Sequence, residues 1–225
     1  LLASKLLSEY MHYVINDKHD NVWIAQREGR AKDSNDRTQE AILKMMVMGG
    51  KGSVVDSLLD LHLVPLAISY EYDPCDFLKA QEFQLKRDIP GWKKSAQDDI
   101  VSMQTGIMGY KGHIHYHAAP CIDAWLRELP ADTSKADIFR IIAEHIDREI
   151  HAHYQLFPAN YVALDMLQGN DAHADKYSAA DKAQFEKYLA GQLAKIQIEN
   201  KDEAYLRECI LKMYANPAIN QLALA

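Results

Sequence analysis

The sequence has few cysteines and no long hydrophobic run, and these absences exclude several classes of protein. Its three cysteines, Cys75, Cys121 and Cys209, are far apart and odd in number, so neither a disulfide framework nor a zinc-finger spacing is present. No apolar run reaches the length of a membrane-spanning helix, and no segment resembles a signal peptide. Repeats and low-complexity segments are also lacking. The sequence therefore predicts a globular protein of a reducing, cytoplasmic compartment.

Basic residues are also fewer than acidic residues. The formal net charge is -7 at pH 7, so attraction of a nucleic acid or an anionic membrane by bulk charge is not expected. With 48% hydrophobic and 25% charged residues, the composition is that of a folded protein. A length of 225 residues suits one large domain, or one domain with an appendage. We expect no nucleic-acid partner.

The hydrophobic pattern of residues 1–129 predicts helices that alternate with strands. The expected helices are Ala3–Asn16, one that begins after Asp36 or Thr38 and stops at Gly49-Gly50, a short one with Ser53 as N-cap, Asp73–Lys86 and Ser95–Met103. The expected strands are "NVWIAQ", "LVPLAISYEY" and "GHIHYHAAP". Alternation of this kind is typical of an α/β domain, a mixed sheet flanked by helices.

Residues 130–225 have a different pattern. Isoleucines recur at every fourth position from Ile138 to Ile150, which predicts an amphipathic helix. Further helices are expected at Ala159–Leu167, Ala179–Ile198 and Asp202–Ala215. We therefore predict an α/β domain at residues 1–129 and an all-helical extension at residues 130–225. The chain also opens in helical rhythm and without Met, so we expect that its natural N-terminus lies further upstream.

The segment "REGRAKDSNDR", Arg27 to Arg37, combines four basic and three acidic residues with one glycine, directly after an apolar run. Such a run is compatible with a solvated loop. It is equally compatible with a phosphate site, since a glycine lets the backbone approach a ligand and arginine suits bidentate contacts with phosphate. Spacing alone does not decide between the two.

Other patterns have simpler interpretations. "GGKGS" at Gly49–Ser53 lacks the spacing of a phosphate-binding loop and is better explained as a helix-terminating turn. His113, His115 and His117 share one strand face, but neighbouring ligands about 7 Å apart do not suit one zinc ion. His12 and Asp17 have the spacing His-x-x-x-x-Asp of a base dyad, yet residues five apart point in different directions on a helix. We therefore predict no metal site, and a metallohydrolase built on the three strand histidines is a remote alternative.

The segments "NVWIAQREGRAKDSNDRTQ" and "LVPLAISYEYDPCD", supported by "KGHIHYHAAP", resemble the glycerolipid acyltransferase family. "AQREGRAK" is similar to its third sequence block, with Glu28 and Gly29 in register, and "LVPLAISYE" is similar to its fourth block, with Pro65 in register. The residues of Ala25–Gln39 are most similar to those of a bacterial branch of glycerol-3-phosphate and 1-acylglycerol-3-phosphate acyltransferase-like proteins. The resemblance covers about residues 1–120.

The sequence departs from the family's pattern at several positions. Arg27 replaces the proline that precedes the family's glutamate, and Ala31 stands where the family has an arginine. Arg30 is the preferred substitute as the phosphate ligand, with Lys32 or Arg37 as alternatives. The His-x-x-x-x-Asp block is expected upstream of Leu1, because His12 and Asp17 lie too close to Glu28 to occupy its place. His12 and Asp17 are thus only a weak candidate for the catalytic pair.

The resemblance implies an acyltransferase of phospholipid biosynthesis. An acyl thioester, carried by acyl-CoA or acyl carrier protein, donates a fatty acyl group to a hydroxyl of a glycerol phosphate or lysophospholipid-like acceptor. It implies that Glu28, Gly29, Arg30, Lys32 and Arg37 hold the acceptor, that Pro65 supports the site, and that no cofactor or metal takes part. It also implies peripheral contact with the inner face of the cell membrane. A non-catalytic anion- or lipid-binding protein is the alternative.

Overall fold

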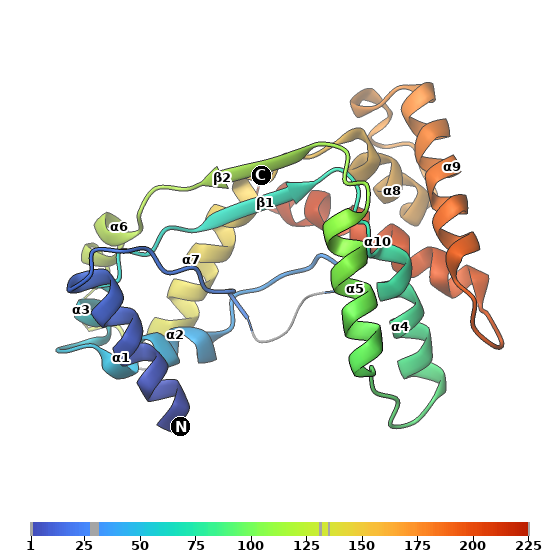
Figure 1. Ribbon diagram of the computed structural model, residues 1–225. Helices are drawn as coiled ribbons and strands as arrows, with labels where there is room; N and C mark the ends of the chain where they lie inside the picture. The colour runs from blue at the N-terminus through green and yellow to red at the C-terminus, as the bar shows by residue number, and fades with distance from the viewer. Residues whose placement is uncertain (1, 28–31, 131, 135, 225) are drawn as a thin grey trace. The chain divides into compact units, whose positions relative to one another are not determined.

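The computed structural model describes residues 2–27, 32–130, 132–134 and 136–224 (Figure 1). It is 59% helical and contains a two-stranded antiparallel sheet. The elements are, in order, α1 (Leu2–Asn16), α2 (Glu40–Met46), η1 (Val47–Gly49), α3 (Val54–Leu59), β1 (Leu66–Tyr70), α4 (Asp76–Asp88), α5 (Ala96–Met108), β2 (Ile114–Ala118), α6 (Asp123–Arg127), α7 (Ile138–Ala152), α8 (Pro158–Gln168), η2 (Ala174–Lys176), α9 (Ala179–Lys195) and α10 (Glu203–Leu222). The predicted mixed sheet flanked by helices is therefore wrong, because helices dominate the fold.

The missing strand of that prediction is "NVWIAQ", which has no regular secondary structure. Trp23, in its middle, is 74% exposed. The Gln39 backbone N–H donates to the Gln26 carbonyl at 2.9 Å, but this single bond does not make a ladder. A short apolar run becomes a strand only beside another strand, and the sheet of the described residues consists of β1 and β2 alone.

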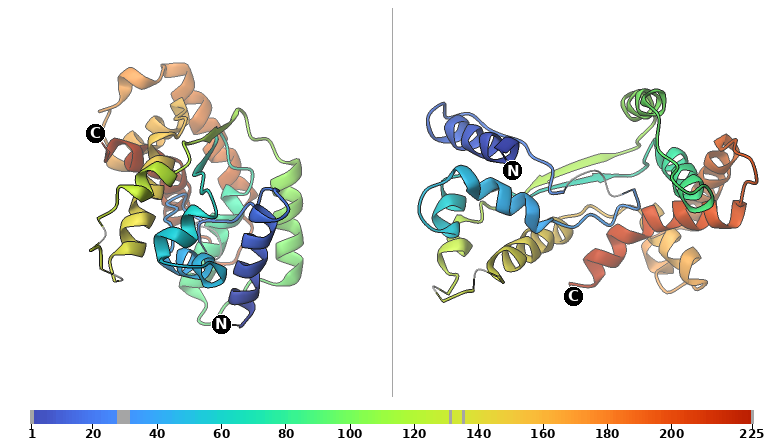
Figure 2. Two further views of the ribbon diagram at one scale, coloured as in Figure 1. Left: turned by 90° about the vertical axis from the view of Figure 1, so that its left-hand side faces the viewer. Right: turned by 90° about the horizontal axis from the view of Figure 1, so that it is seen from below.

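The β1–β2 pair joins segments about fifty residues apart in the sequence. The Glu71 N–H donates to the His113 carbonyl, and the Ala119 N–H donates to the Pro65 carbonyl, each at 2.9 Å. Pro65 is buried and directly precedes β1, where its missing N–H interrupts no ladder bond. The two strands run side by side in all three views (Figures 1 and 2).

The chain packs into two compact units. Unit 1 comprises Leu1–Arg30, Asp36–Ala67 and Tyr116–His153, and unit 2 comprises Ala31–Asn35, Ile68–His115 and Tyr154–Ala225. These units are defined by packing within one chain and not by independent folding. The predicted domain boundary after residue 129 therefore stays a prediction.

In unit 1, α1 lies against η1 through small and polar side chains. The Ser8 hydroxyl donates to the Met46 carbonyl at 2.5 Å and accepts from the Gly49 N–H at 2.8 Å. A Cβ added to Gly49 would lie 2.4 Å from the Glu9 backbone nitrogen, so only glycine allows this approach. The "GGKGS" segment thus ends a helix, as predicted, and Ser53 caps α3 in a capping box with Asp56.

The predicted isoleucine stripe also lies in unit 1, where it forms the inner face of α7. Ile138, Ile142, Ile146 and Ile150 are all buried. Residues four apart occupy the same face of a helix, so this repeat buries one stripe and exposes the other. The helix packs against α2, which contributes the buried side chains Leu43 and Met46. The sequence predicted this element correctly.

Unit 2 is built from α4, α8, α9 and α10 around one apolar cluster. Its centre contains a buried carboxylate, that of Asp76, the first residue of α4. Tyr188 on α9 and Tyr214 on α10 donate to Asp76 Oδ2 at 2.7 and 2.8 Å, and Gln192 on α9 donates to Oδ1. This carboxylate connects three helices by hydrogen bonds.

The last helix is longer than its predicted end at Ala215. α10 continues through Pro217 to Leu222, although proline cannot donate a helical hydrogen bond. Ala218 and Asn220, beyond the proline, are buried. The packing of α10 against α8 accounts for this continuation, because tertiary burial outweighs a local helix-breaking preference.

Asp76 makes the stability of unit 2 depend on pH. Burial raises the pKa of its carboxyl from 3.8 to about 6, even though Tyr188 and Tyr214 donate to the charged form. Because the folded pKa is raised, the stabilisation from this group is complete below about pH 4 and is lost as the pH rises through about 6. The loss corresponds to about 3 kcal/mol.

We therefore expect Asp76→Asn to remove this dependence. In urea unfolding between about pH 4 and pH 7, the free energy of unfolding of the wild type should fall relative to that of the variant by about 3 kcal/mol. Asp171→Asn, at an exposed carboxylate of the same unit, is the control. A wild-type-to-variant difference that stays constant over this pH range would contradict the assignment.

Candidate anion-binding site

The predicted acceptor-binding residues do not all lie in one described part of the chain. Glu28, Gly29 and Arg30 lie outside the described residues. Lys32 belongs to unit 2, whereas Arg37 and Pro65 belong to unit 1. The surroundings of Lys32 and Arg37 are therefore described separately.

Lys32 lies at a cluster of cationic side chains on α4 and the following loop. Its ammonium donates to the carboxylate of Glu82, which is almost completely buried on α4. Lys86 lies one turn further along α4 and binds the same carboxylate at 2.9 Å. The sequence spacing of Glu82 and Lys86 predicts a helical ion pair, but no sequence signal connects either residue with Lys32.

Lys94 adds a third ammonium group to this lysine cluster, defined as Lys32, Lys86 and Lys94. It precedes α5, where it donates to the Ser102 hydroxyl at 2.7 Å and pairs with Asp99 at 3.0 Å. The loop turns back at Gly91, whose φ of +77° lies in the left-handed region that glycine adopts without strain. Three ammonium groups against the carboxylates of Glu82 and Asp99 leave an excess of one positive charge.

The backbone around Lys32 is held by α10. The Asn216 side chain donates to the Asp33 carbonyl at 2.7 Å, and the Asn220 side chain donates to Asn35 Oδ1 at 3.2 Å. These contacts fix the segment that carries Lys32, so its ammonium is directed by the fold and is not that of a free surface loop. Nothing in the sequence connects Asn216 and Asn220 with this segment.

The charges of the lysine cluster act on one another. Burial, and then the charge of Lys86 and its contact with the Lys32 ammonium, lower the pKa of Lys32 to about 8, with a smaller effect from Lys94. The charge of the Asp99 carboxylate acts in the opposite direction, because an anion favours the charged ammonium. At neutral pH, Lys32 is still mostly charged. The cluster can thus bind an anion, and a phosphate oxygen would accept from its ammonium groups.

Arg37 lies in an exposed part of unit 1 whose neighbours are anchored on α7. Asp147 accepts from the backbone N–H and the hydroxyl of Thr38, both at 2.7 Å. The buried His151 lies 3.4 Å from the Asp36 carbonyl through Nε2. Burial, followed by the charge of Arg37, lowers the pKa of His151. Arg37 is thus near a neutral imidazole.

His12 and Asp17, the weak candidate for the catalytic pair, do not have the geometry of a base dyad. His12 is buried, and its Nε2 lies 3.1 Å from the Met46 carbonyl. Asp17 lies beyond the end of α1, is exposed, and makes no hydrogen bond with His12 among the described residues. His12 holds α1 against α2, so the structure gives it a packing role instead of an exposed base.

The strand histidines make separate contacts. His113 Nδ1 bonds Glu71 Oε2 at 2.6 Å, and the His117 ring stacks on His153 with ring centroids 4.1 Å apart. Along β2, half-buried His115 and His117 alternate with exposed residues. This alternation gives the strand one half-buried face and one exposed face. The three imidazoles do not form one metal-binding group among the described residues.

Comparison with protein-family models, with curated proteins and with solved structures found no match to this chain. The resemblance to glycerolipid acyltransferases therefore rests on the sequence segments quoted above and stays a prediction.

The lysine cluster predicts an unusual titration for Lys32. After reductive ¹³C-methylation of the lysines, the Lys32 signal should titrate with a midpoint of about pH 8, well below the ordinary lysine pKa of about 10.4. Lys86→Met should raise this midpoint, because it removes the neighbouring charge that lowers the pKa of Lys32 most. Lys182, paired with an exposed carboxylate of the same unit, provides an internal reference. A Lys32 midpoint equal to that of Lys182 would contradict the clustering.

Proposed function

We propose that this chain forms the acceptor-binding part of an acyltransferase that transfers a fatty acyl group to a glycerol phosphate or lysophospholipid-like hydroxyl acceptor. The observation that carries the proposal is the lysine cluster. Lys32 belongs to the segment that resembles the family's phosphate-binding block, and the fold gathers Lys86 and Lys94 beside it. Glu28, Gly29 and Arg30 complete the acceptor site in this proposal, on the sequence resemblance alone.

The chemistry requires an anion site next to the reacting hydroxyl. The ammonium groups of the cluster hold the acceptor's phosphate and so position its hydroxyl. A histidine base removes the hydroxyl proton, the oxygen attacks the thioester carbonyl of acyl-CoA or acyl carrier protein, and the thiol leaves with a proton. His12 is excluded as that base by its burial against Met46. The proposal assigns this role to the histidine of the His-x-x-x-x-Asp block that the resemblance implies.

We also propose a peripheral contact with the inner face of the cell membrane. No helix of the described residues combines the length and the apolar character needed to cross a membrane. α5, however, has no buried residue and exposes an apolar stripe of Ile100, Met103 and Ile107, with Met108 beside it. Ile107 and Met108 are 72% and 78% exposed. An amphipathic helix of this kind binds at a lipid–water boundary with its apolar face inserted.

A non-catalytic anion- or lipid-binding protein is the second candidate. The observation that favours it is the structural role of His12, which leaves the His12–Asp17 pair without an exposed base. Both candidates require the lysine cluster to bind phosphate. Only the acyltransferase also requires transfer of the acyl group.

Binding and transfer can be measured on the same variants of the protein that contains this chain. Lys32→Ala and Lys86→Ala should each weaken binding of glycerol 3-phosphate by about 10-fold or more, because a hydrogen bond to a charged group contributes about 1.5–3 kcal/mol. Isothermal titration calorimetry measures this affinity. Lys182→Ala, which removes one exposed lysine of unit 2, is the charge-matched control and should leave it unchanged.

Acyl transfer to glycerol 3-phosphate and lysophosphatidic acid decides between the candidates. Loss of transfer with loss of binding in Lys32→Ala and Arg30→Ala supports the acyltransferase. Phosphate binding in a wild type that transfers no acyl group from either donor supports the binding protein. A wild-type protein that does not bind phosphorylated acceptors would contradict both candidate functions.

The membrane contact has its own test. Co-sedimentation with vesicles of phosphatidylglycerol and phosphatidylethanolamine should weaken by about 10-fold or more in Ile107→Asp, because the inserted apolar surface of one isoleucine is worth about 1.5–3 kcal/mol. Leu222→Asp, at an exposed leucine that ends α10, is the matched control. Equal sedimentation of wild type and Ile107→Asp would contradict a contact through α5.

A further inference from the structure

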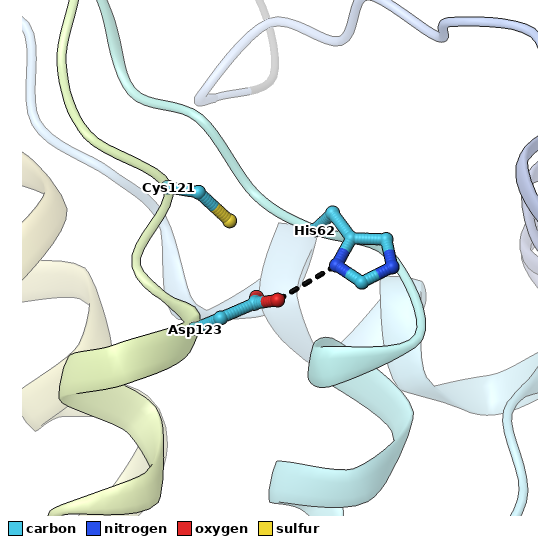
Figure 3. A group of neighbouring side chains, drawn as sticks. All are labelled: His62, Cys121 and Asp123. Atoms are coloured by element: carbon cyan, nitrogen blue, oxygen red, sulfur yellow. Dashed lines mark hydrogen bonds and ion pairs between the residues drawn. The ribbon is translucent and has the colours of Figure 1, made fainter.

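Three side chains that differ in chemistry converge in unit 1, at His62, Cys121 and Asp123 (Figure 3). One donor atom of each lies within 4.8 Å of the others. His62 Nδ1 is 2.7 Å from Asp123 Oδ2, and the Cys121 sulfur points toward this pair. The sequence gives no sign of this group, because His62 is about sixty residues away from the other two.

The backbone holds the two parts of this group together. Beyond the end of the β1–β2 ladder, the Ile122 N–H donates to the Leu63 carbonyl at 3.0 Å. Leu61 and Ile122, which neighbour the donor residues, are buried and anchor both segments in the core of unit 1. The backbone therefore holds the three donor residues in fixed positions, as a preorganised binding site requires.

Two features of the group are costly without a bound ligand. Asp123 Oδ1 is buried and accepts no hydrogen bond from a described residue, and such an atom costs about 1–3 kcal/mol. His62 has a φ of +48°, a left-handed conformation that is uncommon for residues other than glycine. Buried unsatisfied atoms and strained backbone concentrate at ligand-binding sites.

The arrangement does not suit a cysteine nucleophile. Such a site needs one imidazole nitrogen on the thiol and the other on the carboxylate. Here Nδ1 faces Asp123, and the second ring nitrogen points away from Cys121 (Figure 3). The three donors instead surround a common point, with the imidazole open to solvent on one side, since the His62 side chain is 63% exposed.

We propose that His62, Cys121 and Asp123 form a binding site for Zn²⁺ with three protein ligands and one position open to water. Imidazole nitrogen, thiolate sulfur and carboxylate oxygen are the donors that zinc takes in proteins. In a tetrahedral site, neighbouring donor atoms lie about 3.3–3.6 Å apart. Rotation of the exposed Cys121 side chain, and a small opening of the His62–Asp123 pair, reach that geometry from the present one.

Binding of zinc at this site releases a proton. An ordinary cysteine thiol has a pKa of about 8.5 and so carries a proton at neutral pH. Zinc binds the thiolate and displaces this proton, so the affinity rises with pH. This site lies in unit 1 and is independent of the anion site proposed for the lysine cluster in unit 2.

The test is a titration of the metal-free, reduced protein with Zn²⁺, followed by isothermal titration calorimetry in two buffers of different ionisation enthalpy. One equivalent should bind, with release of about one proton. Cys121→Ser, His62→Gln and Asp123→Asn should each weaken binding by at least about 100-fold, because even residues that only support metal ligands contribute about 10- to 100-fold. Substitution by Co²⁺ should give a thiolate-to-metal charge-transfer band that Cys121→Ser abolishes.

Two controls separate this site from adventitious binding. Cys75→Ser removes another thiol, and His113→Gln removes an exposed histidine that also pairs with a carboxylate; neither should change the affinity or the cobalt band. Circular dichroism checks that each variant is folded. The proposal is overturned if the wild type binds no zinc equivalent under these conditions, or if folded Cys121→Ser binds it as tightly as the wild type.

Discussion

The antiparallel pairing of β1 with β2 is the constraint on which most of the described arrangement depends. Its hydrogen bonds bring residues 63–72 beside residues 111–122, although about fifty residues separate them in the chain. At one end of the ladder this register places Glu71 on His113. At the other end it places His62 on Asp123. A shift by one residue would turn the side chains of the shifted strand to the opposite face of the sheet and break this pairing.

Charge is placed within unit 2 in two different ways. Asp76 is buried and has no cationic partner among the described residues, and this burial raises the pKa of its carboxyl even though hydroxyl and amide groups donate to it. The lysine cluster of the same unit is only partly buried and shares its carboxylates, so positive charge remains in excess. The first arrangement stabilises packing, whereas the second favours an anionic ligand. The difference lies in whether the charge is compensated within the fold.

The fold class shows how a correct local pattern can lead to a wrong architecture. The strands at "LVPLAISYEY" and "GHIHYHAAP" form, and the helices at residues 138–222 form, close to their predicted places. The run "NVWIAQ" has the same apolar character as a strand but finds no strand partner in the described part of the chain, and Trp23 stays exposed. Sheet formation needs a neighbour, and hydrophobic pattern does not specify one. The predicted mixed sheet fails on this point.

The sequence alone determined the features that depend on neighbours within one turn. The N-cap of α3 at Ser53, the termination of a helix at Gly49 and the isoleucine stripe of α7 are examples, since each follows from helical geometry. Lys32 was identified as a candidate from its segment, but its partners Glu82, Lys86 and Lys94 were not. Likewise, no pattern connects His62 with Cys121 and Asp123. These groups exist only because tertiary packing and the β1–β2 ladder bring distant residues within a few ångströms, and sequence spacing contains no information on such contacts.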